Sequence, residues 1–195
     1  MDSIKVYVAS ASNSRKKLAK ENDLDWIFVN NEFDEDKIKN ALDVSNFKSV
    51  LEYTKILSRG KAESVKDKYS GIIIGCDSVV YQKGKILEKP KNENEFYKMM
   101  EDITRNIHYL VTGVTIINNL NNKIIQFTEI TKLFFDKFTQ EQKLFLLKEC
   151  NGLSNAGGYT LCEKIDANTH IIKGDRNNVI GLPIKRIQNE IINIL

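Results

Sequence analysis

The 195-residue chain is poor in cysteine, histidine and proline, and it has no long apolar run. Its three cysteines are far apart and form no CxxC pair, and with only two histidines they do not match a zinc site. We therefore expect free thiols in a reducing cytoplasm. No stretch approaches the roughly 18 consecutive apolar residues that span a membrane, and the N-terminal MDSIKVYVAS lacks the apolar core of a signal peptide.

Charge of one sign is not in large excess either. The net charge is +3, which is too small to indicate a nucleic acid or an anionic membrane, and residues of both signs are interleaved. We therefore expect neither a nucleic acid nor a membrane as a partner. The chain has 42% hydrophobic and 28% charged residues, as ordinary globular proteins do, and its length predicts a single domain over residues 1–195.

The order of expected elements indicates the fold class. Apolar patterns predict strands at 4–9, 26–29, 72–74, 79–81, 85–87, 107–117 and 123–136. Helical patterns begin after Ser12 or Asn13, run over about 45–68, and recur near 92–103, 139–150 and 183–195, while 30–44 is an acidic loop ending in a short helix. Gly60 is expected to weaken the long helix. Alternation followed by a long hairpin predicts an α/β fold with a mixed sheet.

The loop after the first strand is a candidate anion site. A strand, a small-residue turn and a helix N-terminus direct backbone N–H groups at one point, and Ser10, Ser12 and Arg15 are placed to bind a phosphate there. An ordinary capped helix with an exposed basic turn explains the same residues. The loop has no Walker A glycines.

Two further residues have a similar pair of interpretations. Asp77 follows the apolar run 72–74, and ligands of open α/β sheets bind beyond the carboxyl ends of strands, so Asp77 can hold a metal or activate water. It can equally accept backbone hydrogen bonds in a turn. Lys89 precedes Pro90, which holds the backbone of Lys89 extended so that its side chain can reach a phosphate. The alternative is that Lys89 is a surface lysine at a strand end. Glu35 and Lys61 are unremarkable as single residues.

Taken together, these segments resemble the Maf (septum-formation) family of nucleotide pyrophosphatases. The resemblance begins at VASASNSRKKL, residues 8–18, where the family has Ala-Ser-x-Ser followed by Pro-Arg-Arg. It spans nearly the whole chain, in order and with matching gaps. The other matching motifs are Phe33-Asp-Glu35, Gly60-Lys-Ala62, Gly75-Cys-Asp-Ser-Val-Val80, Glu88-Lys-Pro90, His108 with Thr112-Gly-Val114, Ala156-Gly-Gly-Tyr159 and Asn178-Val-Ile-Gly-Leu-Pro183.

The resemblance implies an elongated, mixed-sheet α/β molecule of Maf/ITPase-like fold, with two lobes around a central cleft, that is often a homodimer. It implies hydrolysis of nucleoside triphosphates to monophosphate and pyrophosphate with Mg²⁺ or Mn²⁺. By position it makes Glu35 and Asp77 the metal ligands, with Asp77 orienting or deprotonating the water. The implied catalytic residues are Asp77, Glu35, Lys61 and Lys89, and the implied substrate-binding residues are Ser10, Ser12, Arg15 and Ser78.

The chain departs from the family pattern in ways that bear on the substrate. Members acting on dTTP and UTP commonly have Thr where this chain has Ser78, and a branch acting on 7-methyl-GTP has Gln, so Ser78 favours pyrimidine triphosphates. On the other side of the pocket, Ser154, Asn155 and Cys162 replace the usual residues, and Ser14 replaces one arginine. The alternatives are a 7-methyl-GTP pyrophosphatase, or a nucleotide-binding regulator of septum formation with weak catalysis.

Overall fold

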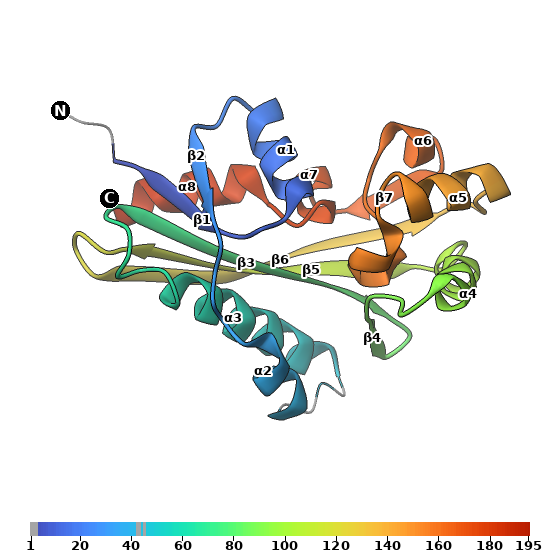
Figure 1. The fold of residues 1–195 in the computed structure, drawn as a ribbon, viewed down its shortest axis with the longest axis horizontal. Coiled ribbons are helices and arrows are strands. Elements are labelled where there is room, and N and C mark those ends of the chain that lie inside the picture. The colour runs from blue at the N-terminus through green and yellow to red at the C-terminus, as the bar shows by residue number, and fades with distance from the viewer. Residues whose placement is uncertain (1–3, 42–43, 45) are drawn as a thin grey trace.

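One long mixed sheet runs the length of an elongated molecule (Figure 1), in a computed structural model that describes residues 4–41, 44 and 46–195. Within these residues the sheet has seven strands in the order β2-β1-β3-β5-β6-β7, with β4 paired to β3. β1 pairs in parallel with β2 and β3, and the other pairs are antiparallel. The predicted mixed α/β class is therefore confirmed. The strands are β1 (Val6–Ala9), β2 (Trp26–Val29), β3 (Ile72–Gln82), β4 (Lys85–Leu87), β5 (His108–Asn118), β6 (Lys123–Phe135) and β7 (Thr169–Lys173).

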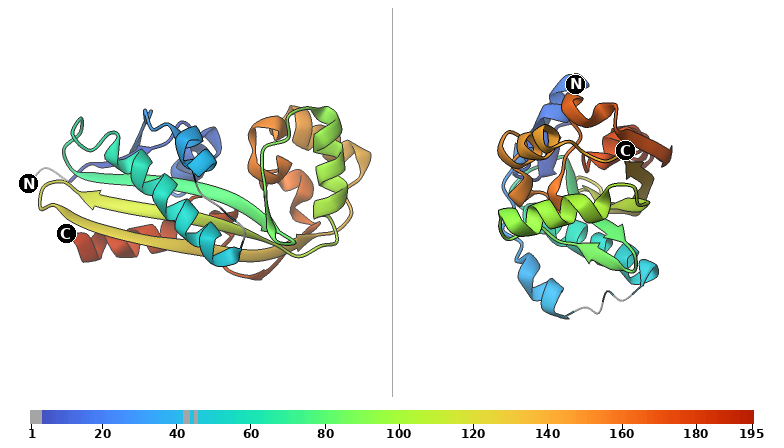
Figure 2. Two further views of the ribbon diagram at one scale, coloured as in Figure 1. Left: turned by 90° about the horizontal axis from the view of Figure 1, so that it is seen from below. Right: turned by 90° about the vertical axis from the view of Figure 1, so that its right-hand side faces the viewer.

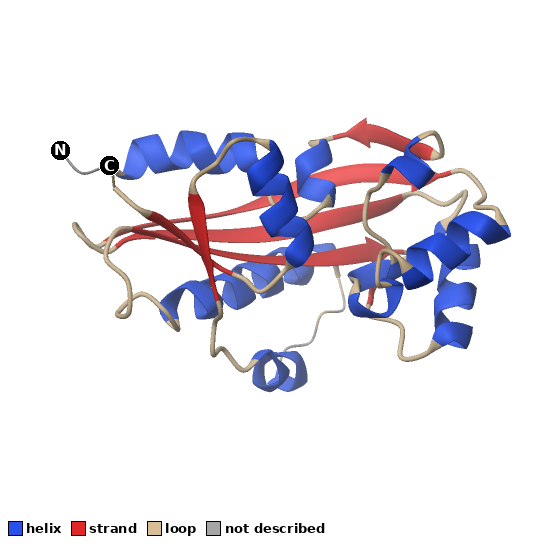
Figure 3. Ribbon diagram, turned by 45° about the horizontal axis from the view of Figure 1, so that its top comes forward, coloured by secondary structure: helices blue, strands red, loops and turns tan. Residues whose placement is uncertain are grey.

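Helices cover both faces of this sheet. Helix α3 lies along one face, and α8 lies along the other, as Figures 2 and 3 show from different sides. The helices α4, α5 and α6 gather at the end of the molecule away from β1 and β2 (Figure 1). The two-lobe description stays a prediction. The helices are α1 (Asn13–Glu21), α2 (Glu35–Ala41), α3 (Phe47–Glu63), α4 (Glu93–Ile103), α5 (Gln140–Lys148), α6 (Glu163–Asp166), α7 (Arg176–Val179) and α8 (Ile184–Ile194), with short 3₁₀ turns η1 (Gly152–Ser154) and η2 (Ala156–Gly158).

Side chains of β3 alternate between the two covered faces. Ile72 and Ile74 pack in one cluster with residues of α8, whereas Val79 packs with residues of α3. Because successive strand residues point to opposite faces, Asp77 lies on the α3 face, and Ser78 lies on the other. This alternation determines which elements each site residue can reach.

Several predicted boundaries are confirmed. β2 and β4 have their predicted bounds, and Ser12 caps α1. The turn at Lys83 and Gly84 has positive φ at both residues, as a tight hairpin requires. Asn46 caps α3, while the expected start at Ser45 lies outside the described residues.

The long helix expected to reach about residue 68 ends at Glu63, and another wrong boundary concerns the site. The runs 72–74 and 79–81 belong to one strand, because the antiparallel ladder with β5 continues from Ile72 to Tyr81 without a break. Asp77 therefore lies in the middle of β3 and does not follow a strand. The strand β7 and the short helices α6 and α7 were not predicted. In the described part of the chain, no helix has both the length and the apolarity to cross a membrane.

Candidate active site

A cleft of about 870 Å³ opens beside the middle of β3. On this edge β3 pairs with β1 as far as Ile74 and with β4 from Val80 onward, so Gly75–Val79 have no paired strand there among the described residues. The structure brings every predicted site residue to this one cleft. The lining includes Ser10, Ser12, Arg15, Glu35, Lys61, Asp77, Ser78 and Lys89.

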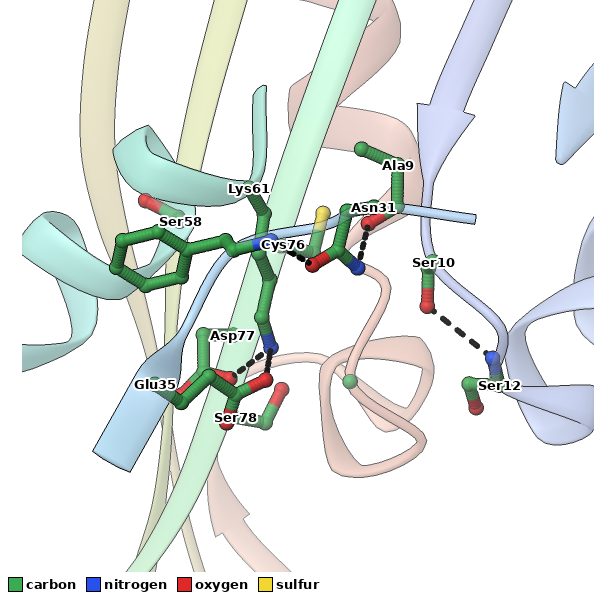
Figure 4. A network of polar contacts seen from close by, with 12 residues as sticks. Ala9, Ser10, Ser12, Asn31, Glu35, Ser58, Lys61, Cys76, Asp77 and Ser78 are labelled. Carbon is green, nitrogen blue, oxygen red and sulfur yellow. Dashed lines mark hydrogen bonds and ion pairs between the residues drawn. The ribbon is translucent and has the colours of Figure 1, made fainter. Parts of the chain in front are cut away.

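The centre of the cleft is a cluster of one lysine and two carboxylates. The Nζ atom of Lys61 lies 2.5 Å from Asp77 Oδ1 and 2.8 Å from Glu35 Oε1 (Figure 4). Lys61 and Asp77 are buried, whereas Glu35, the first residue of α2, is only partly covered. Burial of Lys61 disfavours its charged form, but the neighbouring Asp77 and Glu35 outweigh it and raise the pKa of Lys61. Lys61 is therefore an ammonium ion at neutral pH.

Two glycines allow this cluster to form. A Cβ at Gly75 would lie 2.0 Å from the carbonyl oxygen of Ser58, so only glycine lets α3 approach β3 closely enough for Lys61 to reach Asp77. A Cβ at Gly60 would lie 2.2 Å from the ring of Phe33. Helix α3 continues through Gly60, which therefore gives space to Phe33 and so positions the segment that carries Glu35. The sequence had suggested only that Gly60 weakens the helix.

Arg15 is buried and held by the protein itself. Its Nε donates to the carbonyl of Gly181 at 2.7 Å, and its Nη1 donates to the carbonyl of Cys76 at 2.9 Å and to Ser10 Oγ at 3.1 Å. Its Nη2 donates to Ser78 Oγ at 3.0 Å. These contacts use four of the five N–H donors of the guanidinium. Arg15 therefore joins three segments and leaves one N–H for a ligand.

The serines of the predicted anion loop take part in the same network. The Oγ atom of Ser10 accepts from the backbone N–H of Ser12 at 3.3 Å, and Ser12 Oγ accepts from the N–H of Arg15 at 3.4 Å (Figure 4 draws the first of these). Ser78 Oγ also lies 2.9 Å from Thr112 Oγ1. The capping interpretation of Ser12 and the anion-site interpretation are compatible, because the capped helix begins at the cleft.

Lys89 lines the cleft and is exposed. It follows β4, and the carbonyl of its neighbour Glu88 accepts a hydrogen bond of 3.2 Å from the N–H of Gly157. This contact joins the Lys89 segment to the turn at η2. The cleft therefore has one buried lysine, Lys61, and one exposed lysine, Lys89, among the predicted site residues.

Glu35 and Asp77 are the residues that the family resemblance predicted as ligands of a divalent cation. The described residues contain no group of three or more His, Cys, Asp or Glu side chains that could hold a metal by themselves. Mg²⁺ commonly binds one or two carboxylates and completes its shell with water and substrate phosphates. Two carboxylates that already converge on a single cation, the Lys61 ammonium, fit such an ion when it binds together with a triphosphate.

The cleft also contains a residue that motif reasoning missed. Tyr53 is buried on α3 and lines the cleft with Leu57 and Lys61. Burial, with the negative charges of Asp77 and Glu88 nearby, raises the pKa of Tyr53 above its ordinary value. Tyr53, Leu57 and Lys61 are spaced four residues apart, which places them on one face of the helix. Once Lys61 was a candidate, this spacing could have predicted that Tyr53 faces the same cleft.

Three of the positions that depart from the family pattern lie on the cleft wall formed by residues 150–162. Ser154, Asn155 and Cys162 all line the cleft. The two histidines lie in strands, His108 in β5 and His170 in β7.

Comparison with known proteins agrees with this geometry. A profile of the Maf family, described as Maf-like protein, matches residues 5–194. The dTTP/UTP pyrophosphatases of Clostridium novyi and Clostridium acetobutylicum are each 34% identical to this chain, with 94% of both chains covered. The dTTP/UTP pyrophosphatase of Clostridium perfringens is 31% identical over 97% of both chains. The chain therefore belongs to the Maf family.

Proposed function

We propose that this protein hydrolyses dTTP, UTP and related pyrimidine nucleoside triphosphates to the monophosphate and pyrophosphate. The observation that carries the proposal is the Glu35–Lys61–Asp77 cluster in a cleft of about 870 Å³, which is within the usual size range of small-molecule sites. The names of the relatives, dTTP/UTP pyrophosphatases, support the substrate class.

The reaction needs a water molecule aimed at the α-phosphorus. Asp77 orients this water and accepts its proton, a new P–O bond forms, and the bond from the α-phosphorus to the α–β bridging oxygen breaks. Lys61 holds the Asp77 carboxylate in position, with Lys61 Nζ 2.5 Å from Asp77 Oδ1. Lys89 and the remaining N–H of Arg15 neutralise charge on the departing pyrophosphate. Glu35 and Asp77 would hold a divalent cation, which when bound would supply further positive charge beside the triphosphate.

Ser78 bears on the base preference. The Ser78 hydroxyl, which contacts Arg15 and Thr112, keeps the oxygen that the family's pyrimidine enzymes have at this position. The 7-methyl-GTP branch has a longer amide there, which would have to replace both contacts. A pyrimidine substrate is therefore the better-supported choice.

Pyrophosphate release from a panel of triphosphates, with Mg²⁺ or Mn²⁺, tests the proposal. The panel includes dTTP, UTP, 5-methyl-UTP, CTP, dITP and 7-methyl-GTP. We expect turnover of the thymidine and uridine compounds, and a loss of at least about 10²-fold in Asp77→Asn, because the amide cannot accept the proton. The exposed Asp67→Asn is the matched control and should keep full activity.

The other outcomes separate the alternatives. Turnover mainly of 7-methyl-GTP would support the proposed reaction and contradict the proposed pyrimidine substrate. A folded protein that binds a triphosphate without turning over any would support the septum-formation regulator. The cytoplasmic location, the homodimer, the absence of nucleic-acid binding and the single domain over residues 1–195 stay predictions.

A further inference from the structure

Two cysteines lie at the two ends of the cleft wall formed by residues 150–162. Cys150 and Cys162 are both partly buried free thiols, and both line the cleft. Both also pack against the same hydrophobic cluster, and their side chains interact with each other. The pair is therefore a dithiol open to the nucleotide site. The third cysteine, Cys76, is fully buried in β3 and cannot take part.

The wall between these thiols is braced by one internal contact and tied to the rest of the molecule by two others. The side-chain amide of Asn155 donates to the carbonyl of Cys150 at 2.8 Å. The N–H of Gly157 donates to the carbonyl of Glu88 at 3.2 Å, beside Lys89, and Tyr159 Oη lies 3.2 Å from His108 Nε2. A covalent link between the two ends of the wall would therefore shift groups that face the nucleotide and the segment that carries Lys89.

We infer that Cys150 and Cys162 form a redox-modification site, at which a peroxide converts the two thiols to a disulfide that weakens nucleotide binding. The effect on binding rests on the proposed function, whereas the disulfide chemistry does not.

The chemistry balances with hydrogen peroxide as the oxidant. The sulfur of Cys162 attacks one peroxide oxygen, the O–O bond breaks, and a sulfenic acid and water form. The thiol of Cys150 then attacks this sulfur, the S–S bond forms, and a second water leaves. The two thiols lose two electrons and two protons in total.

The order of these steps follows from the surroundings of Cys150. Burial and the neighbouring Cys162 raise the pKa of Cys150 to about 12, so Cys150 stays a thiol and is the poorer first nucleophile. Cys162 therefore reacts first and Cys150 resolves the intermediate.

The experiment treats the full chain with hydrogen peroxide, alkylates remaining thiols under denaturing conditions and maps the peptides by mass. We expect a disulfide between Cys150 and Cys162, with Cys76 alkylated, and slower formation when UTP is bound. The KM for UTP should rise about tenfold, the size of one lost pocket contact, and should return on reduction. In Cys150→Ser and in Cys162→Ser, peroxide should leave each variant's own KM unchanged.

Two results would overturn the inference. One is that both cysteines remain alkylated after peroxide treatment, and the other is that the disulfide forms with no change in the KM for UTP. If the reduced protein hydrolyses no triphosphate, the proposed function fails, while peptide mapping still decides whether the disulfide forms and whether a nucleotide slows it.

Discussion

At the scale of single residues, Lys61 holds two carboxylates near one nitrogen that is largely excluded from water. Replacing it in Lys61→Met leaves Glu35 and Asp77 facing each other without a cation, and losing one partner of a buried ion pair costs about 3–5 kcal/mol. We expect the free energy of unfolding to fall by this amount at about pH 8. We expect a smaller fall near pH 5, where one carboxylate of the variant can take up a proton. Urea unfolding at both values measures it.

The control for this prediction lies on the same helix. Lys55 pairs with Glu52 at 2.9 Å on the surface, so Lys55→Met should cost no more than about 1 kcal/mol. In the natural protein, the raised pKa of Lys61 contributes stability below the ordinary lysine pKa, and this is lost as pH rises through the folded value. An equal loss in Lys61→Met at both pH values would indicate that packing, rather than charge, explains it.

At the scale of elements, a histidine of β5 anchors the cleft wall. Burial lowers the pKa of His108 from its ordinary 6.5 to about 4, so the neutral ring holds the proton on Nδ1, donating to the carbonyl of Asn106, while Nε2 accepts from Tyr159. The unfolded chain takes up this proton at higher pH than the folded chain. Stability from His108 is therefore complete above about pH 6.5 and falls toward pH 4, by about 3 kcal/mol in total.

The variant His108→Gln should remove this part of the pH dependence, since the amide accepts from Tyr159 and does not titrate. Urea unfolding between about pH 4 and pH 7 measures the slope. The exposed His170, which pairs with Asp136, provides His170→Gln as the control, and its slope should follow the natural protein. A slope in His108→Gln as steep as in the natural protein would contradict the assignment.

Element prediction from the sequence worked where a local signal exists. Helices were expected to begin after Ser12 or Asn13 and near residue 139, and α1 and α5 begin directly after the capping residues Ser12 and Thr139. The turn at Gly84 between the strands expected at 79–81 and 85–87 is equally local. The break expected after Ile74 was wrong because a charge inside an apolar run resembles a strand end. Whether β3 continues past Asp77 depends on its pairing with β5. Asp77 pairs there with Gly113, which lies 36 residues later in the sequence.

At the scale of the whole molecule, the site is assembled from segments that are far apart in sequence. Arg15, Asp77 and Lys89 could be singled out from their own sequence surroundings, because each is a charged side chain beside a strand, loop or proline. Glu35, Lys61 and Ser78 were predicted only through the family resemblance. The partners of Arg15 could not be predicted, because two of them are carbonyl groups, of Cys76 and Gly181, and every residue has one. Gly181 is 166 residues from Arg15, so only the folded chain shows that the contact exists.

This arrangement predicts that variants of two cleft cations, Arg15 and Lys89, differ in their effect on stability. Arg15→Lys keeps the charge but loses the planar fork that joins β3, the loop after β1 and the turn before α8, so we expect about 2–4 kcal/mol lower stability and weaker catalysis together. Lys89 is exposed, so Lys89→Met should keep its unfolding midpoint in urea and lose about 10²-fold in kcat/KM for UTP. Each variant needs both measurements, unfolding and pyrophosphate release. A stable Arg15→Lys protein that is as inactive as Lys89→Met would mean that Arg15 acts on the substrate rather than on the fold.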